Sequence, residues 1–251
     1  MAPIVIKISG HELDSPEYLA EFAEIIRDLN APVVIVHGGG KEISQLQQQL
    51  AIEPKFVDGV RITDAASLAL VEMVLCGTVN KRLVRTLVNA GVNALGISGV
   101  DGGMISAAKL HHESVDMGFT GQVTAVRVDV LLNLLDASMI PVVAPICLGA
   151  ENNFNVNADH VAGAIAAALN ADRLIFLSNV EGVLKDGALI GTLTPEDVDR
   201  LIADGTIFGG MIPKVQTALD TLDNDVQQAV ITNLTGLRQG GGTVFTKASD
   251  S

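Results

Sequence analysis

Residues 33–41, VVIVHGGGK, decide the fold class, because an apolar run ends directly in three glycines. The run predicts a buried β-strand at 33–37, and residues 41–50 predict the helix that follows it. Glycines have no Cβ atom, so successive backbone N–H groups can point at one anion beside a helix N-terminus. We interpret the turn as an anion site, with a plain tight turn as the alternative. The pattern is neither GxxxxGK[ST] nor GxGxxG, the two common nucleotide-binding fingerprints.

The order of strand, small-residue turn and helix recurs on both sides of this stretch. Further strands are predicted at 4–8, 93–97, 141–146, 173–178 and 226–231, and further helices at 16–29, 65–75, 78–90, 129–137, 158–169, 195–203 and 211–222. Residues 103–127 predict a polar hairpin insertion, and GGGTVF at 240–245 predicts an edge strand. The alternation predicts an α/β fold, a three-layer αβα sandwich with a mainly parallel central sheet. Ligands of such sheets bind at the carboxyl ends of the strands.

The composition agrees with this fold class and excludes others. The 251 residues suffice for one large domain or for two lobes that share a core. Hydrophobic residues make up 48%, which excludes general disorder, and aromatic residues only 3%, which predicts an aliphatic core. The net charge of −13 repels nucleic acid and anionic lipid, so we expect neither as a partner. A small anionic ligand is compatible with this charge if a few cations share one cleft.

Cysteine usage and hydropathy predict a cytoplasmic location. Cys76 and Cys147 lie far apart and form no CxxC, which is typical of a reducing compartment and suggests neither a disulfide framework nor a zinc site. The first residues lack the pattern of a signal peptide, and no apolar run is long enough to cross a bilayer.

Three cations stand in settings that suggest a ligand. Lys7 lies within a predicted apolar strand, where an ammonium is costly without a partner, although an edge strand would let it reach solvent. Lys214 lies about one turn into a helix that Gly209 and Gly210 open, although most helical lysines are simply solvated. Arg61, in DGVRITD, can bind a carboxylate with two nitrogens at once, although most loop arginines do not.

The segment NVNADH, residues 155–160, combines amides with one carboxylate just before a small-residue helix. Asn155 and Asn157 could bind backbone groups or a ligand carboxylate. Asp159 falls in the first helical turn, where a negative charge is favoured. A role in helix capping alone is an alternative of equal weight.

Ten motifs together resemble the amino-acid kinase superfamily and, within it, the acetylglutamate kinase family. They occur in the family's order along almost the whole chain: KISG (7–10), HGGG (37–40), GVRITD (59–64), GTVNKRLV (77–84), SGVDGGMI (98–105), GFTGQV (118–123), IPVVAPI (140–146), NVNADHVAGAIA (155–166), LSNVEGVL (177–184) and GGMIPKV (209–215). The resemblance implies an N-terminal lobe, 1–170, for the amino-acid substrate and dimerisation, and a C-terminal lobe, 171–251, for ATP.

The resemblance also implies a role for each matching residue. Lys7 and Lys214 hold the transferring phosphoryl group, and Asp159 orients both lysines. Backbone N–H groups of Gly10, Gly39 and Gly40 bind phosphate, and the last two also border the substrate. Arg61 and Asn155 bind the α-carboxylate of N-acetyl-L-glutamate. ATP is bordered by Asn179, Val180, Glu181, Gly182, Val183, Leu184, Gly209, Gly210 and Met211, and Mg²⁺ is held mainly by the nucleotide phosphates rather than by a protein metal site.

The implied reaction fits the residue chemistry. ATP would phosphorylate the γ-carboxylate to give N-acetyl-L-glutamyl 5-phosphate, the second step of arginine biosynthesis. A carboxylate with a reference pKa of about 4.3 is already ionised at neutral pH, so no general base is required. The problem is to bring two anions together, which lysines, glycine N–H groups and Mg²⁺ can do. The sequence contains no recognisable catalytic base, and this favours the phosphorylation of a carboxylate.

Some alternatives stay open at this point. Ser9 stands where the family usually has glycine, so its hydroxyl could bind phosphate or crowd the turn. A kinase of carrier-linked aminoadipate or glutamate in lysine biosynthesis is the nearest rival, and a sensor without catalysis is another. A homodimer through residues 68–76 is expected, with an ordinary core helix as the alternative, and the sequence leaves control by a PII-type protein open. Feedback by arginine is not expected, because Lys7 stands too near the start of the chain for an extra N-terminal helix.

Overall fold

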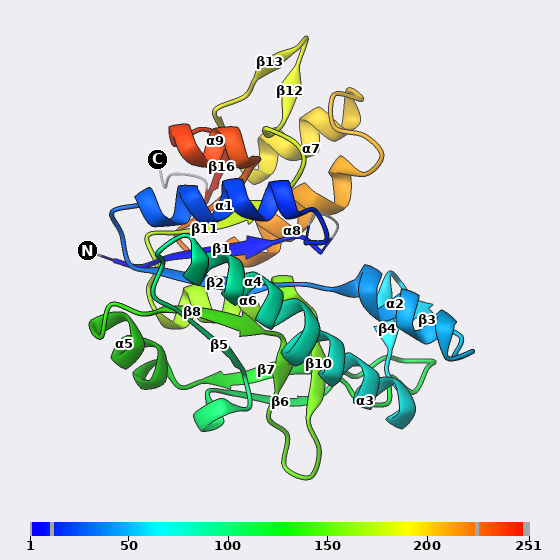
Figure 1. Ribbon diagram of the computed structural model, residues 1–251. Helices are drawn as coiled ribbons and strands as arrows, with labels where there is room; N and C mark the ends of the chain where they lie inside the picture. Colours follow the sequence, from blue (N-terminus) through cyan, green and yellow to red (C-terminus); the bar gives the residue numbers. More distant parts are fainter. Residues whose placement is uncertain (1, 11–12, 224–225, 248–251) are drawn as a thin grey trace.

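The computed structural model describes residues 2–10, 13–223 and 226–247, and its centre is an eight-stranded sheet (Figure 1). The strands lie in the order β14 (Thr192–Leu193), β16 (Thr243–Thr246), β15 (Gln228–Thr232), β11 (Arg173–Leu177), β1 (Ile4–Ile8), β2 (Val33–His37), β8 (Ile140–Ala144) and β5 (Ala94–Ser98). Neighbouring strands are parallel except for the pair β15 and β16. The predicted mainly parallel sheet is confirmed.

Helices cover both faces of the sheet, so the predicted three-layer αβα sandwich is also confirmed. One face carries α1 (Pro16–Asp28), α2 (Gly40–Gln49), α4 (Asn80–Asn89) and α9 (Leu234–Gln239), whose apolar side chains share one core. The other face carries α5 (Val128–Asp136), α6 (Ala158–Ala168), α7 (Pro195–Ala203) and α8 (Met211–Asp223), which share the second core. Strand alternation separates the two cores, because Val5 of β1 lies in the second and Ile6 in the first.

This alternation also determines the direction of Lys7, the lysine of β1. Strand β1 pairs with β2 on one side and β11 on the other, so it is central, and the edge-strand alternative for Lys7 is wrong. Lys7 has the parity of Val5 and therefore points to the face that α6 covers. A central strand cannot release this ammonium into solvent sideways, so the side chain needs a partner beyond the strand end.

A smaller, four-stranded sheet lies below the main one in the view of Figure 1. It consists of β6 (Ile105–Lys109), β7 (Thr120–Val126), β10 (Phe154–Val156) and β9 (Ile146–Cys147). Strands β6 and β7 are antiparallel, which confirms the predicted hairpin insertion. Two further hairpins were not predicted from the sequence: β3 (Lys55–Val57) with β4 (Val60–Ile62), and β12 (Leu184–Lys185) with β13 (Ala188–Leu189).

Two sequence predictions require correction. The helices predicted at 65–75 and 78–90 form one continuous helix, because α3 (Ala65–Glu72) runs through a π-helical segment η1 (Met73–Val79) into α4. The strand at the GGGTVF motif is not an edge, because β14 pairs with β16 on its outer side. A short 3₁₀ turn, η2 (Asp101–Gly103), completes the elements. Within the described ranges, no helix is long and apolar enough to cross a membrane.

Candidate active site

Two glycine turns meet at the carboxyl ends of β1 and β2. Gly10 follows β1, and residues 38–40 follow β2 and lead into α2. A Cβ atom on Gly10 would lie 3.0 Å from the backbone nitrogen of Gly39, so only glycine allows this approach. The N–H groups of Gly10, Gly39 and Gly40 donate no hydrogen bond within the described part of the chain. They therefore form a set of donors for an anion at the N-terminus of α2.

These turns form one wall of a large cleft. Its volume is 1060 Å³, and it brings together six residues predicted from the sequence: Lys7, Gly10, Gly39, Gly40, Arg61 and Asp159. The opposite wall comes from the end of α2 and from the β3–β4 hairpin, which lie to one side of the main sheet (Figure 1). A cleft at the carboxyl ends of parallel strands is the expected place for a ligand.

Lys7, Asp159 and Lys214 meet in a small pocket next to the cleft. Its volume is 180 Å³, and Ser9 and Ser178 also line it. The Lys7 ammonium lies 2.9 Å from Asp159 Oδ1, with the two side chains 14% and 23% exposed. Lys214 Nζ donates to Ser178 Oγ and to Asn179 Oδ1, at 3.3 Å each. Two ammonium groups beside one carboxylate leave an excess of positive charge for a phosphoryl group.

The helix-capping interpretation of Asp159 does not match the geometry. The N-cap of α6 is Asn157, whose side-chain oxygen accepts a hydrogen bond from the Asp159 backbone N–H at 2.8 Å. The Asp159 carboxylate is instead directed to Lys7. Its place in the first turn of α6 still stabilises its negative charge.

Arg61 lies in β4 and is almost buried, at 8% exposure. Its Nη2 donates to the Gly40 carbonyl at 3.1 Å and to Ser44 Oγ at 2.8 Å, and its Nη1 donates to Gln47 Oε1. The guanidinium also stacks on the Phe56 ring, 4.7 Å from the ring centre. Burial lowers the pKa of Arg61, although a guanidinium stays charged. The charge is thus held in one orientation before any substrate arrives.

A second pocket of 180 Å³ joins Arg61 to Asn155 and to the glycines 38–40. Asn155 lies in β10 and donates to Thr63 Oγ1 at 3.0 Å. Much of the remaining wall is apolar and includes Leu75 and Pro145. A pocket with one cation, one amide and apolar walls suits a small carboxylate that carries an alkyl or acyl group.

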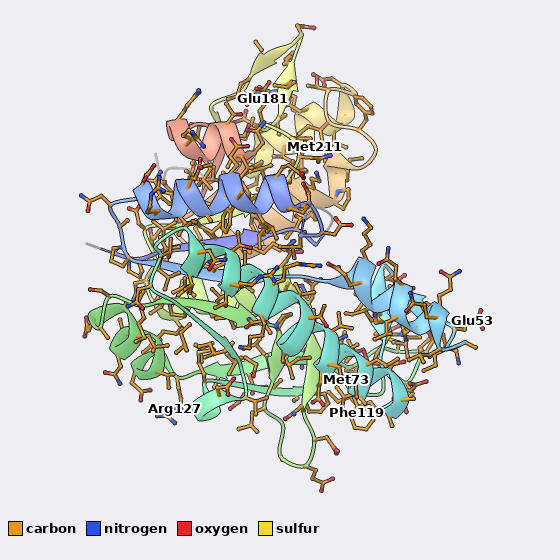
Figure 2. All side chains as sticks on the ribbon, viewed as in Figure 1. Glu53, Met73, Phe119, Arg127, Glu181 and Met211 are labelled. Carbon is orange, nitrogen blue, oxygen red and sulfur yellow. The ribbon has the colours of Figure 1, made fainter. Side chains whose placement is uncertain are left out.

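A separate pocket of 460 Å³ contains most of the residues predicted to border ATP. It is lined by Asn179, Val180, Glu181, Gly182, Val183, Leu184, Thr206, Phe208, Met211 and Asn233. Gly209 and Gly210 are not among its lining residues, although they lead directly into α8. Figure 2 shows Glu181 and Met211 in the upper part of the molecule, far from Glu53, which lines the large cleft.

Ser9 uses its hydroxyl within the protein. Its Oγ donates to the Leu177 carbonyl at 3.1 Å, and its backbone N–H donates to the same oxygen at 3.3 Å. The serine therefore ties the end of β1 to the end of β11. In the described ranges, no three His, Cys, Asp or Glu side chains group closely enough to hold a metal ion.

Sequence analysis missed several residues that support the site. Gln47 and Ser44 hold Arg61, Phe56 stacks on it, and Ser178 binds Lys214. Ser178 lies within the LSNVEGVL motif and could have been found there. Phe208 lines the upper pocket and is 73% exposed, and an exposed aromatic residue next to two glycines is a usable signal.

Comparison with known proteins identifies the class of protein that this fold and site define. The model of the amino acid kinase family matches residues 2–233, and the chain belongs to that family. A solved structure from Streptococcus mutans UA159, smu.665, superposes with a TM-score of 0.80 at 33% identity, over 97% of this chain and 98% of that one.

Curated relatives narrow the assignment to the acetylglutamate kinases. The acetylglutamate kinase of Roseiflexus sp. (strain RS-1) is 52% identical over 97% of this chain and 94% of the relative. That of Methanopyrus kandleri is 46% identical over 96% of this chain and 98% of the relative. N-acetylglutamate synthase from Neisseria gonorrhoeae has a TM-score of 0.84 at 22% identity, which shows a shared fold only.

Proposed function

We propose that this chain transfers the γ-phosphoryl group of ATP to the γ-carboxylate of N-acetyl-L-glutamate. The observation that carries the proposal is the juxtaposition of two anion sites of different kinds. Lys7, Lys214 and the glycine N–H groups surround one position, and Arg61 with Asn155 surrounds a second position beside it. A dicarboxylate can occupy both, with one carboxylate held by Arg61 and the other facing the phosphoryl group.

The pocket beside Arg61 supports an acylated amino acid as the substrate. Arg61 would hold the α-carboxylate by its charge and by the second Nη1 hydrogen, because Gly40 and Ser44 already use both Nη2 hydrogens. Asn155 would add an amide donor on the same side. The apolar part of the wall gives the methyl group of an acetyl a place out of water, where a charged α-ammonium would be disfavoured.

In the proposed reaction an oxygen of the γ-carboxylate attacks the γ-phosphorus of ATP. A new carboxyl oxygen–phosphorus bond forms, the bond between the γ-phosphorus and the bridging oxygen breaks, and ADP leaves with that electron pair. The protein stabilises charge rather than moving protons, because the nucleophile is already ionised. Lys7 and Lys214 bind the transferring group from the two sides of the pocket, and the N–H groups of Gly10, Gly39 and Gly40 bind its equatorial oxygens.

Asp159 has a positioning role in this proposal. Two ammonium groups near one another repel, and a carboxylate beside them offsets that repulsion. The 2.9 Å ion pair with Lys7 fixes one ammonium at the end of β1. The Asn179–Leu184 segment and Met211 would border the adenine and ribose. Mg²⁺ would be held mainly by the phosphates of ATP, since these carry the charge it prefers.

The proposal is tested by measuring ADP release with a panel of acceptors. N-acetyl-L-glutamate, L-glutamate, L-aspartate and carbamate are compared at equal concentration, together with a carrier-linked aminoadipate. We expect turnover with N-acetyl-L-glutamate at least about 10²-fold faster than with L-glutamate, because the apolar wall would lose the acetyl group and face a charged α-ammonium instead. Preferential turnover of the carrier-linked acceptor, or of carbamate, would contradict the proposal.

We further infer a cytoplasmic homodimer, as expected from the sequence. Met73 is 63% exposed on η1, and Leu95 is 39% exposed on the outer strand β5, so two apolar side chains are available next to an open sheet edge. Light scattering after size exclusion measures the mass directly. A monomer at micromolar concentration would contradict this part of the proposal.

A further inference from the structure

Behind the glycine turn lies a buried polar network that takes no part in the cavities described above. His37 is the last residue of β2 and is fully buried, at 0% exposure. Its Nδ1 lies 2.8 Å from the Gly38 carbonyl oxygen, and its Nε2 lies 3.1 Å from Asn80 Nδ2. Asn80 is the first residue of α4 and is 1% exposed. A buried imidazole between a backbone carbonyl and an amide requires an explanation.

The neighbours of Asn80 determine which way its amide faces. Its Nδ2 donates to the Val142 carbonyl at 2.9 Å, and its Oδ1 accepts from Lys81 Nζ at 3.0 Å. One amide hydrogen is thus used by Val142, and the other points at His37. The Nε2 atom of His37 must therefore be the acceptor, which leaves the ring proton on Nδ1. The Nδ1–H group then donates to the Gly38 carbonyl.

The charge state of His37 supports the same assignment. The pKa of His37 is lowered to about 4, mainly by burial and in smaller part by the charges of Lys81 and Arg82, against the opposing effect of the Gly38 hydrogen bond. The ring is consequently neutral near pH 7 and carries a single N–H. Because a neutral ring has one donor and one acceptor, the Asn80 contact alone fixes the tautomer.

The Gly38 carbonyl controls the direction of the next N–H group. The chain has no cis peptide bond among the described residues, so the Gly38 C=O and the Gly39 N–H point in opposite directions. The carbonyl faces the buried His37 ring, and the Gly39 N–H therefore faces away from the core. The close approach of Gly10 to the Gly39 nitrogen puts that N–H on the cleft side.

Packing around the network resists any other arrangement. Leu75 and Val79 of η1 lie directly beneath Gly39, where an added Cβ would be 2.7 and 3.3 Å from their methyl groups. On β5, Gly96 has no Cβ, and the space that a Cβ would need is occupied by Asn80 Oδ1. The continuous helix through η1 and α4 thus supports the turn from below and supplies Asn80 in the same stretch.

We propose that His37, held in its Nδ1–H tautomer by Asn80, is a positioning residue that directs the Gly39 N–H at the transferring phosphoryl group. The inference rests on the proposed function for the identity of the anion. It assigns no chemical step to His37, which does not line the cleft. Its contribution is to fix one donor before the transition state forms, where preorganised donors have their effect.

Two substitutions at position 37 separate the two ring nitrogens. His37→Asn places an amide nitrogen near Nδ1 and keeps the donor to Gly38, while losing the contact to Asn80. His37→Gln places its terminal amide near Nε2 and keeps the contact to Asn80, while losing the donor to Gly38. We expect kcat to fall about 10²-fold in His37→Gln, as on losing one preorganised donor, and less than tenfold in His37→Asn. KM for both substrates should change by less than threefold.

Thermal unfolding of both variants separates positioning from stability. A general loss of buried hydrogen bonds would lower the melting temperature of the two variants alike, and kcat would follow it. The proposal is overturned if kcat falls equally in both variants. It is also overturned if the loss of kcat in each variant simply follows the loss of its melting temperature. An active wild-type enzyme is required for this comparison, so an inactive wild type counts against the proposed function instead.

The tautomer itself is measured on the wild-type protein, without any dependence on folding of the variants. Two-bond ¹H–¹⁵N spectra distinguish Nδ1–H from Nε2–H rings, and the chain has five histidines. Single substitutions of the other four assign the remaining signal to His37. We expect a neutral Nδ1–H ring from pH 6 to 8. An Nε2–H ring, or an imidazolium in this range, would overturn the proposal whatever the enzyme phosphorylates.

Discussion

The proposed active site has two halves, the acetylglutamate position beside Arg61 and the separate ATP pocket beside Phe208, and they differ in how much of their geometry the protein holds by itself. Around the proposed acetylglutamate position, Arg61 is almost buried and already has three hydrogen-bond acceptors and an aromatic ring around it. Around the proposed ATP position, Phe208 is 73% exposed and Leu184 is 40% exposed. The first half is organised before binding, and the second presents side chains that a nucleotide would cover.

This difference indicates whether each half mainly controls the rate or the affinity. A preorganised group adds little ordering cost when its ligand arrives, so its loss affects orientation and rate. An exposed side chain gains its contacts only on binding, so its loss affects affinity through the area it would have buried. Substitutions on the two sides should therefore divide between kcat and KM, and the predictions below test that division in order of decreasing effect.

The largest effect is expected where the two halves meet. Lys7→Ala and Lys214→Ala should each lower kcat about 10²-fold or more, because the charge on the phosphoryl group grows where these ammonium groups point. KM for acetylglutamate should rise far less. Steady-state kinetics with both substrates measures the split. Lys109→Ala is the control, since Lys109 pairs with Asp116 on the surface of the smaller sheet. An unchanged kcat would show that the substituted lysine does not bind the transferring phosphoryl group.

The second prediction concerns Asp159→Asn. The ion pair with Lys7 becomes a neutral hydrogen bond, so we expect kcat to fall by about tenfold or more with modest changes in both KM values. Stability should also fall, because the mostly buried Lys7 ammonium loses its charged partner, although Asn157 and not Asp159 caps α6. Kinetics and thermal unfolding are measured on the same preparation. A fully active variant of normal stability would show that the carboxylate has no part in positioning Lys7.

The third prediction concerns Arg61→Lys in the preorganised half. Lysine keeps the charge but cannot reach Gly40, Ser44 and Gln47 together in one plane. We expect the Kd for acetylglutamate to rise about tenfold and the Kd for ATP to stay within twofold, as measured by calorimetry. Equal weakening for both ligands would instead indicate a general folding defect, which circular dichroism would detect.

The smallest effect is expected in the exposed half. Phe208→Ala should raise KM for ATP about threefold to tenfold through lost contact area, with kcat unchanged. The melting temperature should stay the same, because the ring is largely exposed without nucleotide. Leu189→Ala is a matched control, since Leu189 is 41% exposed nearby on β13 and does not line the pocket. A lower kcat for Phe208→Ala would contradict the proposed division between the two halves.

Much of the site could be predicted from the sequence because parallel strands bring their carboxyl ends together. Lys7, Gly10 and Gly39 lie at the ends of neighbouring strands, and Asp159 begins the helix that covers them. The central position of β1 could not be predicted in this way, since one apolar strand resembles another until its neighbours are known. The core alternation that aims Lys7 at α6 depends on that position.

The remaining parts depend on contacts between distant segments. Gln47 is 1% exposed and holds Arg61, yet the surrounding run QLQQQL offers four similar glutamines. Only the packing of α2 against β4 distinguishes one of them. Likewise, the gap between the helices predicted at 65–75 and 78–90 contains Gly77, and glycine costs about 1 kcal/mol in a helix interior. In the structure Gly77 lies within η1, whose wider turn is part of a continuous helix.

The π-helical segment has a consequence for how this chain tolerates insertions and deletions. A π turn contains about one residue more than an α turn, so removing one residue between Met73 and Val79 would restore ordinary α-helical winding. The residues beyond the deletion would face nearly the same way as before. Asn80 would still face His37 on β2, and Arg82 would still face Glu42 on α2. A deletion within α4 would instead turn every later residue of that helix by about 100°. The π-helical segment is therefore the place in this long helix where the loss of one residue is tolerated best.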